Sequence, residues 1–88
     1  MKVAATQLDV VVGDVDANLA ECERLAREAA RAGAEMVALP EFFSTGAAFD
    51  PKVAEGIRRR DGEPAQMLAS VAASEGIFLG GSFLCRDP

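Results

Sequence analysis

The chain of 88 residues contains no histidine, tryptophan or tyrosine, and only two cysteines. Without histidine, it cannot by itself supply Ser-His or Cys-His catalysis or a histidine-containing metal site. No apolar run is long enough to span a membrane, and the N-terminus lacks the pattern of a signal peptide. We therefore expect a soluble, cytoplasmic protein.

Basic residues are also scarce. The chain has nine lysines and arginines against fourteen aspartates and glutamates, which gives a net charge of −5. This balance disfavours nucleic acid and anionic membranes as partners, because both require a basic patch. The one basic run, at 58–60, is followed at once by Asp61 and Glu63, which is typical of a solvated loop.

The two cysteines lie far apart in the sequence. Cys22 falls within an apolar helical stripe, which indicates a small buried thiol, whereas Cys85 follows the last apolar run. The sequence leaves a disulfide between them open but does not indicate an oxidising compartment.

The apolar pattern predicts one small α/β domain. We expect strands over 2–8, 35–39 and 77–84, and helices over 15–32 and 63–75. Asp14 or Asp16 is placed to cap the first helix, and Gly33 to end it. The connection 41–61 allows a short helix over 51–58. Gly80 and Gly81 predict a bulge or a close backbone approach in the last strand.

Strands that alternate with helices predict a parallel sheet with right-handed crossovers. If the strands lie in sequential order, both helices cover the same face of the sheet. The other face, which also carries apolar side chains, is then bare, and such a surface indicates an interface or an incomplete domain.

Glu41 is the strongest chemical signal, because it follows a short apolar strand and Pro40 and precedes Phe42 and Phe43. We expect this carboxyl group to be sequestered among apolar neighbours, an environment that suits a general base. The alternative is an ordinary capping or loop acid. Phe42 and Phe43 are expected in the core, with a role in lining a substrate pocket as the alternative.

The sequence resembles the start of the carbon–nitrogen hydrolase (nitrilase) family. Four segments carry the likeness: VAATQ at 3–7, GDVDAN at 13–18, GAEMVALPEFF at 33–43 with Gly46 shortly after, and GIFLGGS at 76–82. The third segment is specific, whereas the others alone would be weak. Residues 1–88 would then form the N-terminal part of such a domain.

The resemblance implies that this β-α-β-α-β portion belongs to a four-layer α-β-β-α sandwich, which is incomplete here. It also implies a Glu-Lys-Cys mechanism on a small amide or nitrile, with Glu41 as general base, no cofactor and no metal, in a homo-oligomeric enzyme. The family's lysine and cysteine motifs lie further on, and Lys2, Lys52, Cys22 and Cys85 do not match them. We therefore expect the chain alone to be inactive.

Two other functions are open. The chain could be an inactive remnant that binds another protein through its uncovered sheet face. It could also be a small flavodoxin-like binding module, although the lack of a glycine-rich turn after the first strand argues against this. The sequence does not distinguish nitrile from amide substrates.

Overall fold

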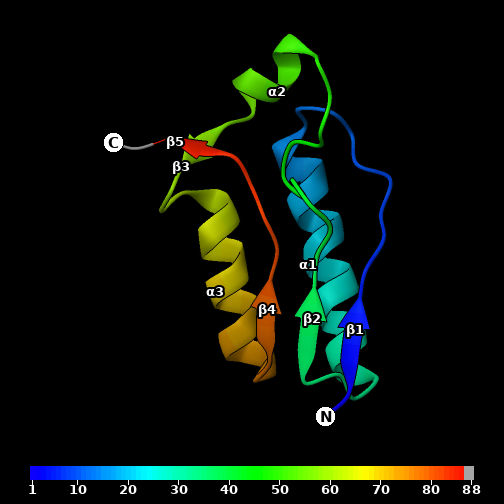
Figure 1. Cartoon of the computed structure of the whole chain (residues 1–88). Helices are drawn as coiled ribbons and strands as arrows, with labels where there is room; N and C mark the ends of the chain where they lie inside the picture. The colour runs from blue at the N-terminus through cyan, green and yellow to red at the C-terminus, as the bar shows by residue number, and fades with distance from the viewer. Residues whose placement is uncertain (87–88) are drawn as a thin grey trace.

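The computed structural model describes residues 1–86, and its main strands and long helices follow the predicted alternation, with two short strands that were not predicted (Figure 1). The elements are β1 (Val3–Ala5), α1 (Val15–Arg31), β2 (Met36–Ala38), α2 (Pro51–Glu55), β3 (Arg58–Arg59), α3 (Glu63–Glu75), β4 (Phe78–Gly80) and β5 (Cys85–Arg86). None of the helices in this part of the chain is both long enough and apolar enough to cross a membrane.

The main sheet consists of three parallel strands in the sequential order β1-β2-β4, as predicted. Its register aligns Val3 with Met36 and Phe78 in one row across the sheet. The next row, which begins at Ala4, faces the opposite side, because successive side chains of a strand alternate between faces.

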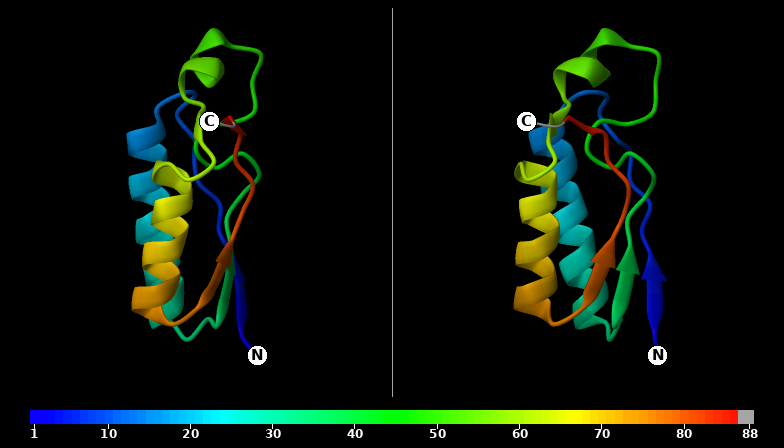
Figure 2. Two further views of the ribbon diagram at one scale, coloured as in Figure 1. Left: turned by 90° about the vertical axis from the view of Figure 1, so that its left-hand side faces the viewer. Right: turned by 60° about the vertical axis from the view of Figure 1, so that its left-hand side comes forward.

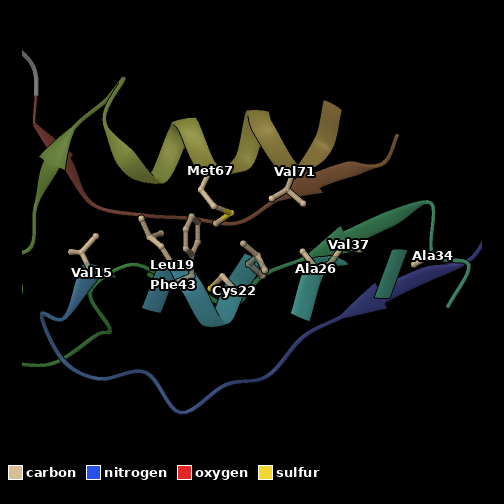
Figure 3. Close-up of a cluster of buried hydrophobic side chains, with 10 residues drawn as sticks. Val15, Leu19, Cys22, Ala26, Ala34, Val37, Phe43, Met67 and Val71 are labelled. Carbon is tan, nitrogen blue, oxygen red and sulfur yellow. The ribbon is translucent and has the colours of Figure 1, made fainter. Parts of the chain in front are cut away.

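Helices α1 and α3 both lie on one side of this sheet (Figure 2). The core forms between them and the sheet, where Met67 and Val71 of α3 approach the side chains of α1 and β2 (Figure 3). The fully or nearly buried apolar residues of this cluster are Val15, Leu19, Cys22, Ala26, Ala34, Val37, Leu39, Phe43, Met67 and Val71.

The second face of the sheet is uncovered within residues 1–86, which confirms the prediction. Val3 is 59% exposed, Met36 39% and Phe78 66%, although all three are apolar. These three residues form the uncovered row referred to below. Water therefore contacts a strand surface of a kind that parallel sheets normally bury.

The helix boundaries follow the local signals in the sequence. The Asp14 carboxylate accepts a hydrogen bond from the Ala17 N–H (3.1 Å), so this residue, and not Asp16, caps α1. The helix ends before Gly33, whose φ of +102° belongs to the left-handed region that favours glycine. The helix α3 covers 63–75 as predicted, whereas α2 is shorter than the segment 51–58 that the sequence allowed.

The predicted strands were too long, because each of the three strands leaves the regular ladder after three residues, and the chain then follows a path without regular pairing. Single backbone hydrogen bonds still join this path, from Thr6 N–H to Ala38 C=O (3.0 Å) and from Leu39 N–H to Gly80 C=O (2.8 Å). The prediction of a loop at the arginine run was also wrong in part, since Arg58 and Arg59 form β3 and pair with β5.

Cys22 is completely buried, which confirms the prediction of a buried thiol there. Cys85, for which burial was not predicted, is exposed. Both are free thiols, so the open possibility of a disulfide is not realised. Burial raises the pKa of the Cys22 thiol to about 11. This thiol therefore stays protonated at neutral pH and is a poor nucleophile.

Candidate functional site

The three parallel strands point the same way, so their carboxyl ends meet at one edge of the sheet (Figure 1). In open parallel sheets, this edge is where ligands generally bind. Beyond β2, the central strand, come Leu39, Pro40 and Glu41, and the chain then turns through 41–45. The sequence therefore places Glu41 at the centre of the edge where chemistry is expected.

Glu41 is exposed, which contradicts the expectation that its carboxyl group would be sequestered. The turn directs Phe43 into the core, where it is completely buried, and leaves Glu41 outside. No hydrogen bond or ion pair joins the Glu41 side chain to another residue in the described range 1–86. The apolar residues next to Glu41 in the sequence therefore do not shield its carboxylate from water.

The turn that carries Glu41 has an unusual backbone. Phe42 has a φ of +50°, the one positive value outside glycine in the described part of the chain. Its C=O accepts a hydrogen bond from the Gly46 N–H (2.8 Å). Left-handed backbone is unfavourable for a bulky side chain and persists only where surrounding contacts hold it.

Ser82, which follows β4, supplies two such contacts. Its hydroxyl oxygen accepts a hydrogen bond from the Phe42 N–H (3.0 Å), and its C=O accepts one from the Phe43 N–H (3.1 Å). Gly81 makes this approach possible, because a Cβ there would lie 2.9 Å from both Leu39 Cβ and Phe43 Cδ1. The predicted close approach is therefore found at Gly81, whereas a Cβ at Gly80 would meet nothing within 4 Å.

The two phenylalanines have different surroundings. Phe43 contacts Phe83 edge to face, with ring centroids 5.6 Å apart, so its core assignment is confirmed. Phe42 is only half-buried and lines an apolar hollow of about 300 Å³. The other residues that line it are Gly46, Ala47, Ala48, Phe49, Val53 and Leu84.

Asn18 fixes the far end of the turn from within α1. It is buried, its Oδ1 accepts the Val11 N–H (2.8 Å), and its Nδ2 donates to Val11 C=O (2.8 Å) and Ser44 C=O (2.9 Å). Ser44 and Thr45 are buried in this turn.

A second hollow, of about 440 Å³, opens between the ends of β1 and β2. Gln7, Leu8, Asp9 and Pro40 line it. Sequence reasoning did not assign Gln7 or Asp9 to the site. The signal for them was their place directly after the first strand, because neighbouring parallel strands end side by side.

The other candidate groups lie elsewhere. Glu35 precedes β2 at the opposite edge, and the Lys2 ammonium donates to the Ala32 C=O (3.1 Å) at the end of α1. Arg58 forms an ion pair with Glu63 (2.7 Å). Within residues 1–86 there is no group of three or more side chains that could hold a metal ion.

Sequence comparisons relate the chain to known proteins. Residues 2–87 match the sequence model of the family described as "Carbon-nitrogen hydrolase". A nitrilase from Pyrococcus abyssi is 33% identical over 84 residues, which are 90% of this chain and 31% of that protein. The omega-amidase NIT2-B of Xenopus laevis is 44% identical over 73 residues, 80% of this chain and 25% of that protein.

The omega-amidase NIT2 of Mus musculus is 42% identical over the same number of residues, 73, with the same coverage of 80% and 25%. The chain thus spans between 25% and 31% of the length of these relatives. The match to the family model nevertheless extends over nearly every residue. The chain belongs to the carbon–nitrogen hydrolase family.

Proposed function

We propose that Glu41 is the general base of a hydrolase that cleaves a non-peptide C–N bond in a small amide or nitrile. The position of Glu41 carries the proposal, since it follows the central strand, in the segment most specific to the family. The relatives named above are a nitrilase and omega-amidases, which supports this substrate class.

In this Glu-Lys-Cys mechanism, the Glu41 carboxylate takes the proton from a cysteine thiol. The thiolate attacks the amide or nitrile carbon, and a lysine stabilises the negative charge that develops on the substrate oxygen or nitrogen. From an amide, ammonia leaves with a proton returned by the carboxyl group and a thioester remains. Water, activated by the same carboxylate, then hydrolyses the thioester to the acid and regenerates the thiol.

The lysine and the cysteine of this mechanism come from outside residues 1–88 in our proposal. Cys22 is unsuitable because it is buried in the core and its pKa is raised to about 11. Lys2 is engaged at the opposite edge of the sheet. The chain alone is therefore inactive towards amides.

The uncovered row of Val3, Met36 and Phe78 supports the proposed four-layer sandwich. A second sheet packed on this face would remove these side chains from water. It would also bring further chain close to the edge that carries Glu41. The exposure of Glu41 is, on this view, a property of residues 1–88 taken alone.

Complementation tests this function. The chain is co-expressed with the part of the Pyrococcus abyssi nitrilase that lies beyond its matching segment, and ammonia release is measured over a panel of small amides and nitriles. We expect activity only when both parts are present. Glu41→Gln should lower kcat/KM by at least about 10²-fold, the usual scale for loss of a general base.

Glu35→Gln is the matched control, because it makes the same chemical change at the opposite end of the same strand. It should leave kcat/KM unchanged. Full activity of the Glu41→Gln complex would show that another group takes the thiol proton, and the assignment of Glu41 would be wrong.

A second candidate function is protein binding by an inactive chain, and the exposure of Val3 and Phe78 favours it. This function predicts that the chain folds stably and captures a partner through that face, without restoring activity to the remainder of a relative. Ammonia release that depends on Glu41 would reject it.

A further inference from the structure

The position of the Glu41 carboxylate depends on the conformation of the next residue. Phe42 has a φ of +50°, and Phe43 after it is anchored in the core. A change of φ at Phe42 rotates the Glu41 side of the chain relative to Phe43. The direction in which the Glu41 side chain leaves the backbone therefore depends on the conformation of Phe42.

The contacts that hold Phe42 come from a distant part of the sequence. Two consecutive amides of the turn donate to Ser82, the Phe42 N–H to its hydroxyl (3.0 Å) and the Phe43 N–H to its carbonyl (3.1 Å). The bond to the carbonyl would exist for any residue at position 82. The bond to the hydroxyl depends on the side chain at position 82, because alanine there would offer the Phe42 amide no side-chain acceptor.

We propose that Ser82 is a positioning residue for Glu41, which acts through the Phe42 amide. The inference rests on the proposed function of Glu41 as general base. Ser82 touches neither substrate nor the thiol in this scheme. Its hydroxyl holds the backbone from which the Glu41 side chain departs, and a misplacement of a catalytic group by about 1 Å can cost about 10²-fold in rate.

The test uses the complemented enzyme with Ser82→Ala and Ser82→Thr. We expect Ser82→Ala to lower kcat by about 10²-fold with little change in KM, because the substrate contacts remain while the base is misplaced. Ser82→Thr keeps the hydroxyl and should recover most of kcat. Ser70→Ala, at an exposed position of α3, is the control and should leave both constants unchanged.

A merely structural role of Ser82 would give a different pattern. It would lower the yield or the midpoint of thermal unfolding of the complex and leave kcat of the folded fraction intact. An unchanged kcat in a folded Ser82→Ala complex therefore overturns the proposal. If that variant does not fold, Ser82→Cys replaces it, and failure of both to fold would make Ser82 a determinant of the fold and also overturn the proposal.

Measuring Glu41→Gln in parallel separates this inference from the function on which it rests. Loss of activity in Glu41→Gln with normal kcat in Ser82→Ala would reject only the positioning role. Normal activity in Glu41→Gln would reject the general base and the positioning role together. Loss in both variants, with recovery in Ser82→Thr, is the outcome we expect.

Discussion

Asn18 is a buried polar residue whose hydrogen bonds hold two loops next to the candidate site. Its side-chain amide accepts one hydrogen bond from Val11 and donates one each to Val11 and Ser44. A buried amide is costly unless all its partners are present. The single asparagine of the chain therefore connects the loop after β1 with the turn that carries Glu41.

Asn18→Asp should destabilise the chain by at least about 2 kcal/mol at neutral pH, because a buried carboxylate would face two carbonyl oxygens that now accept from the amide. Burial raises the pKa of the introduced carboxyl group, so the penalty is present at neutral pH and shrinks as the pH falls towards about 4. Urea unfolding at several pH values measures this.

Ala20→Asp places the same residue on an exposed position of α1 and serves as control, with a far smaller loss and little dependence on acid pH. Equal losses in the two variants would show that the Asn18 hydrogen bonds contribute nothing specific.

The elements differ in how well the sequence predicts them. The helices α1 and α3 were placed to within one residue, because their caps and apolar stripes are local signals. The sequence did not predict the short strands β3 and β5. Their residues, Arg58–Arg59 and Cys85–Arg86, show no apolar alternation, and these strands form only by pairing with each other.

The candidate site shows the same limit. Glu41 was found from its neighbours in the sequence, but its exposure depends on what packs over the turn, and that is a property of the tertiary structure. The contact between Phe42 and Ser82 joins residues 40 positions apart. No periodicity or spacing could have indicated it.

The N-terminus of α1 offers a test at the scale of an element. Asp14→Ala removes the side-chain acceptor for the Ala17 N–H and should lower the free energy of unfolding by about 1 kcal/mol. Asp14→Ser keeps an acceptor and should lose much less. Urea denaturation compares the variants, and equal stability of Asp14→Ala and the original chain would show that the cap contributes nothing.

For the whole molecule, the uncovered row of the sheet is the feature with the largest consequence. A chain of this size buries a limited core, and here one sheet face contributes nothing to it within the described residues. We expect the isolated chain to be marginally stable. Copies should also associate through this face as the concentration rises, because contact removes Phe78 and Val3 from water.

Phe78→Thr tests this expectation, since threonine keeps the strand propensity but removes the exposed ring. Burying a phenylalanine contributes about 1.5–3 kcal/mol, so association should weaken by at least about tenfold. Light scattering over a concentration series measures it. Val71→Thr is the contrasting variant, because Val71 is completely buried and its loss should unfold the chain and not merely separate copies. A chain that stays monomeric at every concentration and unfolds in one sharp, reversible transition would mean that this face needs no cover, and a second sheet would have no physical reason to pack on it.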